Sequence, residues 1–367
     1  MNKRCSGSIG VCVVTAIAFN ALSFCLAQPL ASTSASKAVP GYVVYWGIGA
    51  SAHHSAGVAT NGALTYNGAL VDDILSVSAG YFHALALRKN GTVLGWAGDR
   101  FGEASGVPSL GTNRAVKLVS LHGGVLTNVI AVAAGWNHSL ALKGDGTVAV
   151  WGMEAGGNTP VRTAESASNI AAIACGITYR VGLTRSGEVI DLYLGRRVPG
   201  LSNIVAVSVQ QSMHPMGVAL LADGTVAMFG TNGMPEYATQ IPNRADFVSV
   251  ACGAHHNLAL TRAGNIWGWG SDGMGEATGT MNTNPPYFSA GLVRLKGKEL
   301  NDVIAVASSD MFSLALLNDG TIRNWGNSYN PSFAIPVGLS NVVAITAGPR
   351  FCLAITTNAA VAERFRR

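Results

Sequence analysis

Residues 129–152 read VIAVAAGWNHSLALKGDGTVAVWG, and this stretch decides the fold because its pattern recurs along the whole chain. Alternating apolar residues lead into Ala-Gly, two variable residues, a histidine or aromatic residue, and then Leu-Ala-Leu or a close variant. A turn ending in Gly follows, and after it Thr-Val and Trp-Gly. Six further copies, some divergent, begin at residues 74, 170, 204, 247, 303 and 342.

The seventh copy stops before its Trp-Gly, and the missing part stands at the other end of the chain. Residues 42–47 read YVVYWG, the strand that normally follows the Gly turn. An N-terminal strand that completes the C-terminal blade closes a ring and leaves no open edge. The sequence therefore predicts an all-β fold, a seven-bladed β-propeller over residues 41–358, closed by pairing of the N-terminal strand with the C-terminal blade.

Within each copy, residue types predict local structure. Asn90-Gly91 and the Asp-Gly pairs at residues 145, 223 and 319 predict type I′ hairpin turns. The Gly of Ala-Gly predicts a close backbone path at the end of the first strand. Tryptophans that precede Gly or Ala are expected to fill the space between blades. They are Trp46, Trp96, Trp151, Trp269 and Trp325.

The ends of the chain differ from the repeats. Residues 1–27 resemble a secretory signal peptide, with Lys3 and Arg4 before an apolar stretch and Ala27 at a small-residue cleavage site. An uncleaved membrane anchor is the alternative, but the stretch is short for a span. We expect cleavage, no stable membrane span afterwards, and a secreted protein, whether periplasmic, cell-surface or extracellular. Residues 28–40 are predicted to be a flexible linker and residues 359–367 a C-terminal tail.

Composition excludes several functions. Only 12% of the 367 residues are charged, and the net charge of +5 is spread without a run of Lys or Arg, so no nucleic-acid partner is expected. Cleavage leaves Cys175, Cys252 and Cys352, an odd number that argues against a disulfide framework. Cys175 and Cys252 stand where other copies have Ala, which favours small buried fillers. No CxxC pair remains, so neither a metal nor a cofactor is expected.

The repeats resemble the regulator of chromosome condensation repeat family. The likeness covers residues 41–358 and includes altered forms of a Trp-Gly-x-Asn-x-x-Gly-Gln/Glu segment, WAGDRFGE at residues 96–103, WGSDGMGE at 269–276 and FGTNGMPE at 229–236. The resemblance implies a seven-bladed propeller. The family's namesake is a nucleotide exchange factor, a role that a signal peptide opposes. A secreted bacterial propeller of this class inhibits β-lactamases by covering their active site, which implies protein binding through one face.

No catalytic residue is predicted. His83, His138 and His256 share one repeat position with Tyr179, Phe312 and Phe351, which favours packed side chains that bond a neighbouring backbone group. His53-His54 has no carboxylate or Cys nearby and is a weak metal candidate. Signatures such as GxSxG, HExxH and GxxxxGK[ST] are absent from the sequence. Most carboxylates stand at turns or are scattered between the expected blades.

The better candidates for function are the variable pairs between Ala-Gly and the histidine position. Seven blades place seven such pairs in a ring on one face, where loops on a rigid scaffold commonly carry function. Aromatic, Met and Arg residues there match the composition of binding hot spots. The partner-binding residues predicted from this ring are Tyr81, Phe82, Trp136, Asn137, His255, Met311 and Arg350.

These residues favour a secreted, non-enzymatic protein that binds a protein partner. A glycan-binding module is the alternative, since Trp and Tyr also stack on sugar rings, and an enzyme with a site in the central channel is the third. Residues 284–288 (NPPYF) form a second candidate contact loop or a stiff connector. Residues 115–120 and 291–296 are each predicted to add an outer strand.

Overall fold

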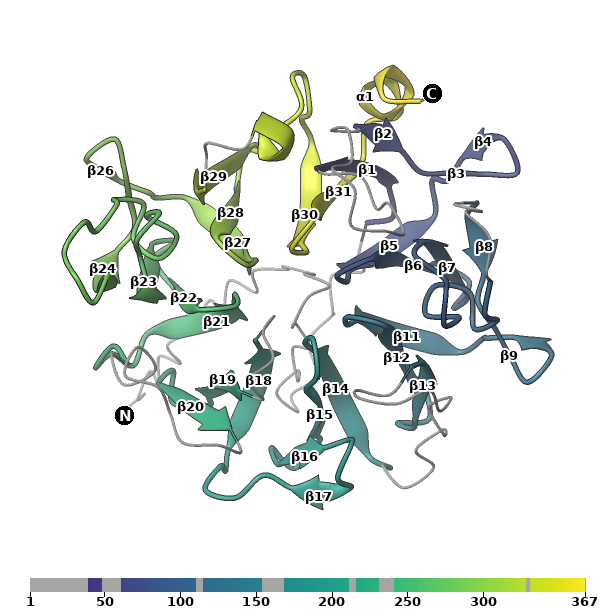
Figure 1. The fold of residues 1–367 in the computed structure, drawn as a ribbon, viewed down its shortest axis with the longest axis horizontal. Helices are drawn as coiled ribbons and strands as arrows, with labels where there is room; N and C mark the ends of the chain where they lie inside the picture. The colour runs from purple at the N-terminus through teal and green to yellow at the C-terminus, as the bar shows by residue number, and fades with distance from the viewer. Residues whose placement is uncertain are drawn as a thin grey trace, which may run out of the picture.

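The computed structural model describes residues 39–47, 61–109, 115–153, 168–210, 216–230, 241–327 and 331–366. Seven sheets surround a central axis, and the chain visits them in sequence order (Figure 1). The seven-bladed β-propeller predicted from the repeats is confirmed. The predicted signal peptide, His53-His54 and all but two residues of the predicted linker lie outside the described residues.

The first three blades follow the repeat pattern. Blade 1 contains β5 (Ile74–Ala79), β6 (His83–Arg88), β7 (Val93–Ala97) and β8 (Lys117–Leu118). Blade 2 contains β11 (Val129–Ala134), β12 (His138–Lys143) and β13 (Val148–Gly152). Blade 3 contains β14 (Ile170–Cys175), β15 (Arg180–Thr184), β16 (Val189–Asp191) and β17 (Arg196–Arg197). Neighbouring strands within each blade are antiparallel.

The next three blades repeat this order. Blade 4 contains β18 (Ile204–Val209), β19 (Met216–Leu221) and β20 (Val226–Gly230). Blade 5 contains β21 (Phe247–Cys252), β22 (His256–Thr261), β23 (Ile266–Ser271) and β24 (Phe288–Leu292). Blade 6 contains β27 (Val303–Ser308), β28 (Phe312–Leu317) and β29 (Ile322–Gly326). The outer strand predicted at residues 115–120 is β8, which pairs with β7. The one predicted at residues 291–296 lies earlier in the chain, at β24, which pairs with β23, whereas Arg294–Leu295 belong to a separate hairpin.

Blade 7 is made from both ends of the chain. Its inner strands are β30 (Val342–Ala347) and β31 (Phe351–Thr356), and its outer strands are β1 (Tyr42–Gly47) and β2 (Gly62–Ala63). Strand β1 pairs with β31 without interruption from Tyr42↔Thr356 to Gly47↔Phe351. The predicted closure of the ring is therefore confirmed.

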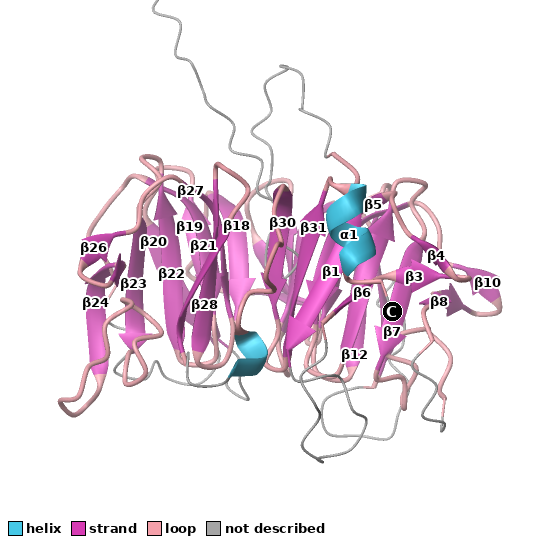
Figure 2. Cartoon of the chain, turned by 90° about the horizontal axis from the view of Figure 1, so that it is seen from above, coloured by secondary structure: helices cyan, strands magenta, loops and turns pink. Residues whose placement is uncertain are grey.

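Small elements decorate the rim and the ends of the blades. Three short hairpins form separate two-stranded sheets. They are β3–β4 (Thr65–Tyr66, Ala69–Leu70), β9–β10 (Ser120–Leu121, Gly124–Val125) and β25–β26 (Arg294–Leu295, Lys298–Glu299). A 3₁₀ turn, η2, spans Pro331–Phe333, and helix α1 spans Ala359–Arg364 within the predicted C-terminal tail. Asn358 caps α1 by accepting from the Ala360 and Val361 amides, and the helix packs against β1 and β31 (Figure 2).

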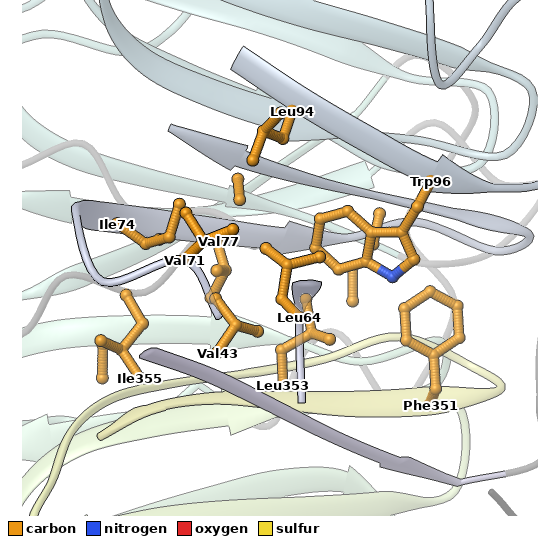
Figure 3. Packing of buried hydrophobic residues seen from close by; sticks show 14 residues of the cluster. Val43, Leu64, Val71, Ile74, Val77, Leu94, Trp96, Phe351, Leu353 and Ile355 are labelled. Atoms are coloured by element: carbon orange, nitrogen blue, oxygen red, sulfur yellow. The ribbon is translucent and has the colours of Figure 1, made fainter. Parts of the chain in front are cut away.

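A separate apolar cluster fills each junction between neighbouring blades. All five predicted tryptophans are buried in these clusters, each facing the preceding blade, and the prediction for them is confirmed. Figure 3 shows the junction of blades 7 and 1, where Trp96 lies beside Phe351. At the repeat position of these tryptophans, blade 4 has Phe229 and blade 3 has Leu192. Burial of these large side chains is the main force that holds the blades together.

The predicted type I′ turns are wrong. In the hairpin between β6 and β7, Gly91 has a φ of 76° and Asn90 does not have a positive φ. The Gly91 amide donates to the Arg88 carbonyl and the Arg88 amide donates to the Thr92 carbonyl, both at 2.9 Å. The loop is therefore one residue longer than the two-residue loop of a type I′ hairpin. It consists of a type I turn followed by a glycine in the left-handed region. The Asn90 side chain accepts from the Thr92 amide at 3.0 Å, which explains the preference for Asn or Asp.

Candidate functional site

The turns between the first and second strands of the blades lie on one face, which we call the ring face. It is the lower edge in Figure 2, opposite α1. Third strands run parallel to first strands, so the long connections that follow them reach the same face. The ring face therefore carries both the variable pairs and the longest loops.

Close backbone contacts between blades hold these turns in place. The Tyr81 amide donates to the Gly135 carbonyl of the next blade at 2.9 Å, and the Ala254 amide donates to Ser309 at 3.0 Å. A Cβ on Gly80 would lie 2.4 Å from the Gly135 carbonyl oxygen, and one on Gly253 would lie 2.2 Å from that of Ser309. Glycine is required here for close approach, as predicted.

The repeat-position histidines connect neighbouring blades. His83 Nε2 lies 2.7 Å from Ser139 Oγ of blade 2, and that hydroxyl donates to the Glu103 carbonyl at 2.7 Å. Because the hydroxyl has one proton, His83 Nε2 must be the donor to Ser139. Trp151 Nε1 donates to the same Glu103 carbonyl at 3.0 Å. The partner of Nε2 is thus a side chain of the next blade, not the backbone group that the sequence suggested.

The junction of blades 5 and 6 repeats this network. His256 Nε2 lies 2.8 Å from Ser313 Oγ, which donates to the Glu276 carbonyl at 2.9 Å. Trp325 Nε1 donates to the same carbonyl at 3.0 Å. Burial lowers the pKa of His83 and His256 to about 3, with a neighbouring histidine adding to the shift in each case. Both imidazoles are neutral near pH 7 and act as structural donors.

At the junction of blades 2 and 3 the network changes. Arg180 takes the place of the serine, and His138 Nε2 lies 3.1 Å from Cys175 Sγ. Burial raises the pKa of Cys175 and Cys252 to about 12. Cys175 and Cys252 are free and buried, in agreement with the prediction of small fillers, and Cys352 is free and buried as well. Within the described ranges, His, Cys, Asp and Glu form no group of three placed to hold a metal.

The acidic residues after β7 and β23 organise their loops. Asp99 Oδ1 accepts from the Ala104 and Ser105 amides at 3.1 and 2.9 Å. Asp272 Oδ1 accepts from the Ala277 and Thr278 amides, both at 2.9 Å. Burial raises the pKa of Glu103 to about 7. No acid/base pair is predicted here from the sequence, and the contacts of Asp99 and Asp272 give these carboxylates a structural role.

Four of the predicted ring residues form one cation–aromatic cluster, which we call the aromatic cluster. The rings of Tyr81 and Phe82 are 4.6 Å apart, and Tyr81 lies 5.9 Å from Trp136 of blade 2. The Arg350 guanidinium of blade 7 lies 5.4 Å from the Tyr81 ring and 5.2 Å from the Phe82 ring. All four side chains are partly exposed, so three consecutive blades present a continuous contact surface.

Two further ring residues line a pocket at blades 5 and 6. His255 and Met311, both exposed, face Met274 and Tyr287 across a pocket of about 480 Å³, which we call the Met-lined pocket. Burial raises the pKa of the adjacent Asp310, while His255 opposes and Glu276 adds to this shift. The structure thus joins the ring to the predicted second contact loop, residues 284–288, through Tyr287. The seventh predicted residue, Asn137, is half-buried and belongs to neither group.

Sequence reasoning missed Met274 and the Arg100–Phe101 pair, whose guanidinium and ring are 5.4 Å apart. Phe101 and Met274 stand at the same place in the two Asp-x-x-Gly-Glu segments, two residues before Glu103 and Glu276. A comparison of these segments with each other shows that this place and the one before it, Arg100 or Gly273, vary while the Asp and the Gly-Glu around them do not. This difference between the two segments is the sequence signal that could have identified Arg100, Phe101 and Met274.

A closed ring of β-blades with variable turns on one face defines a β-propeller. The family model "Regulator of chromosome condensation (RCC1) repeat" matches residues 74–102, 129–157 and 247–276. Three stretches of the chain are therefore similar to this repeat.

Curated relatives are similar over part of their length. The chain is 28% identical to the E3 ubiquitin-protein ligase HERC2 of Homo sapiens over 256 residues, which cover 67% of this chain and 5% of HERC2. It is 28% identical to Protein pim1 of Schizosaccharomyces pombe over 228 residues, 54% of this chain and 37% of pim1. The match therefore spans only a minor part of these relatives.

Solved structures share the fold. Yeast RCC1 (Prp20), solved with Kap60, is 18% identical with a TM-score of 0.62 and covers 92% of this chain and 97% of its own. The ectodomain of the Arabidopsis thaliana receptor kinase ACR4 is 16% identical with a TM-score of 0.51, covering 78% and 92%. At these identities the likeness shows the fold alone.

Proposed function

We propose that this chain is a secreted, non-enzymatic binding protein that holds a protein partner on its ring face. The observation that carries the proposal is the aromatic cluster, in which Tyr81, Phe82, Trp136 and Arg350 come together from three blades. Tyr, Trp and Arg are the residue types most enriched in binding hot spots. Close backbone contacts beneath them fix the turns before binding, which lowers the entropy lost on association.

The chemistry of the buried polar groups supports a binding role. His83 and His256 are neutral and hydrogen-bonded between blades, and Asp99 and Asp272 are occupied by backbone amides. None of these groups is presented with the nucleophile and base geometry that acyl or phosphoryl transfer needs. The exposed chemistry of the described ring face is aromatic, thioether and guanidinium, which suits contact better than turnover.

Secretion is supported by residues 1–27, with their charged start and apolar stretch. The part of the chain that the structure describes contains no helix long and apolar enough to cross a membrane. A structural neighbour with the same fold is the ectodomain of a receptor kinase, so this architecture occurs outside cells. Protein partners are named for other neighbours, Kap60 in one structure and Gsp1p and histones in another.

The test uses residues 28–367 as bait on the exported proteins and surface glycans of the source organism. The loss variant combines Tyr81→Ala, Phe82→Ala and Trp136→Ala. The matched control combines Val125→Ala and Ile130→Ala, which replace exposed apolar side chains at the rim and at the opposite end of β11. We expect capture of a protein that the control retains and the loss variant binds roughly 30-fold or more weakly.

Three other outcomes would lead to different conclusions about the function. A protein captured equally by all three forms moves the contact away from the aromatic cluster. Capture of a glycan, lost in the loss variant, supports the alternative of a glycan-binding module, since Trp and Tyr stack on sugar rings. Reproducible turnover of a secreted-enzyme substrate by the wild-type chain contradicts the non-enzymatic role.

A further inference from the structure

Arg350 is held on the ring face in an unusual environment. It follows Gly348-Pro349 in the turn between β30 and β31, and its guanidinium lies over both Tyr81 and Phe82. The side chain is partly buried by these rings. A cation–π contact involves no acceptor atom, so it leaves the N–H donors of the guanidinium without a carboxylate partner.

Among the described residues, Arg350 forms no ion pair and no side-chain hydrogen bond. Some other arginines differ, because Arg88, Arg244 and Arg294 each lie within 2.9 Å of an acidic side chain. The acids of the loop after β7 do not take this role. The Asp99 carboxylate accepts hydrogen bonds from two backbone amides and from the Ser105 hydroxyl, and it forms an ion pair with Lys117. The Glu103 carboxylate accepts from the Phe101 amide.

A second cation lies on the same face. Arg100 follows Asp99 in that loop, is exposed and stacks on Phe101 at 5.4 Å. The loop is tied to the aromatic cluster, because the Gly98 amide donates to the Phe82 carbonyl at 2.8 Å. Arg100 also forms no ion pair with a described residue. Two arginines that each contact an aromatic ring, and that lack an internal carboxylate, are available to an anion from outside the molecule.

We propose that the ring face binds an acidic segment of its partner, with a partner carboxylate on Arg350 and apolar side chains on Tyr81 and Trp136. This inference rests on the proposed protein-binding function. A planar guanidinium matches a carboxylate through two parallel N–H···O bonds. Two separated cations among aromatic rings do not form the continuous basic track that a nucleic-acid backbone requires. Arg350 supplies the charge recognition and the rings supply the apolar contact area.

The test pans a phage-displayed library of random 12-residue peptides on residues 28–367. Parallel selections use Arg350→Gln, Arg350→Lys and the Tyr81/Phe82/Trp136→Ala variant, and thermal melting checks that each is folded. We expect the wild type to enrich peptides that carry Asp or Glu next to apolar residues. Arg350→Gln should retain the apolar preference and lose the acidic one. Arg350→Lys should keep part of it, since it keeps the charge and loses the planar fork.

A double-mutant cycle then measures the contact. The best peptide is synthesised with Glu and with Gln at the enriched position, and both are titrated on the wild type and on Arg350→Gln. We expect Glu→Gln to weaken binding to the wild type at least about tenfold and to leave binding to Arg350→Gln nearly unchanged. Arg100→Gln should show a smaller effect of the same sign, because Arg100 is more exposed.

The outcomes separate the inference from the proposed function. Peptides that depend on the aromatic cluster but show no acidic preference overturn the carboxylate site and leave protein binding intact. A selection identical on the wild type and the Tyr81/Phe82/Trp136→Ala variant, or no enrichment on either, overturns both. Competition by polygalacturonate without any acidic peptide also overturns the inference, because it assigns the arginines to a glycan.

Discussion

The junction of blades 1 and 2 and the junction of blades 5 and 6 are built alike and carry different surfaces. In both, a histidine meets a serine of the next blade, and that serine and a tryptophan donate to one glutamate carbonyl. Corresponding distances differ by 0.2 Å at most. The two junctions therefore share one scaffold, down to single hydrogen bonds.

Above this scaffold the side chains diverge. Blades 1 and 2 present Tyr81, Phe82 and Trp136, whereas blades 5 and 6 present His255 and Met311 around a pocket. The loops differ in the same way, with Phe101 at one junction where Met274 stands at the other. The comparison shows that the repeat fixes where a side chain is displayed and leaves its chemistry free. Variation on such a scaffold changes partner choice with little change in stability.

Removal of the closing strand should have the largest effect, because both junctions depend on a closed ring. Deletion of residues 41–47 takes away the partner of β31 and exposes its edge. We expect the loss of a single cooperative unfolding transition in calorimetry, or aggregation in size-exclusion chromatography. A deletion of residues 29–38 keeps β1 and serves as the control. A truncated chain that melts like the full chain would contradict the role assigned to β1.

Substitution of the close-approach glycines should give the next largest effect, and an equal one at both junctions. In Gly80→Ala and Gly253→Ala, the new Cβ meets a carbonyl oxygen of the next blade at 2.4 and 2.2 Å. We expect each to lower the free energy of unfolding by about 1–3 kcal/mol in urea titrations. Gly291→Ala, where the added Cβ would meet no atom within 4 Å, is the matched control. A large difference between the two variants would break the equivalence of the junctions.

Acid should weaken both junctions through their histidines. In the unfolded chain a histidine takes up a proton below about pH 6.5, whereas the pKa of folded His83 and His256 is about 3. Stability is therefore fully present above pH 6.5 and falls as the pH drops toward 3, by about 1.4 kcal/mol per pH unit for each histidine. His83→Phe and His256→Phe, which copy Phe312 of blade 6, should each reduce the slope between pH 6 and 4 by that amount.

Glu103 acts in the opposite direction to the histidines. Its folded pKa is about 7 against an ordinary 4.5, so the folded state holds an extra proton between these values. Its contribution is fully present below pH 4.5 and is lost as the pH rises through 7. In Glu103→Gln, the free energy of unfolding should therefore fall more steeply as the pH drops from 7 to 4.5. Equal pH profiles for the two histidine variants, measured in urea at several pH values, would confirm that the histidine networks match.

The smallest effect tests a position where the junctions differ in backbone. Ala97 has a φ of 75°, and blade 5 places Gly270 at the same repeat position with a φ of 108°. A non-glycine residue is strained there, while glycine costs more entropy on folding. We expect Ala97→Gly to raise the free energy of unfolding by less than about 1 kcal/mol without affecting binding. A clear loss of stability in thermal melts would show that the Ala97 methyl contributes packing that outweighs the strain.

The sequence predicts the architecture well because the same strand pattern recurs in seven copies. Blade count, closure through residues 42–47 and the buried tryptophans all follow from the recurrence of one pattern. The turn type was not predictable from Asn90-Gly91 alone, because loop length, set by strand register, selects the turn. The serine partner of His83 was missed because it comes from the next blade, 56 residues away, where a single sequence shows no contact.

The candidate site was predicted in part. The variable pairs were located correctly as turns of one face, since their position within the repeat determines their direction. Their grouping into an aromatic cluster and a Met-lined pocket depends on side-chain packing between blades, as with Arg350 over Tyr81. Arg100 and Met274 were missed because they belong to loops after the third strand, whose path follows from Asp99 and Asp272.

The pairing of β1 with β31 also constrains when the molecule can form. The strand that is synthesised first has to wait for the strand that is synthesised nearly last, so the ring stays open while the ribosome completes the six blades between them. Such distant pairings make folding slow. The edge of β1 that faces β31 therefore stays without its partner until synthesis is nearly complete.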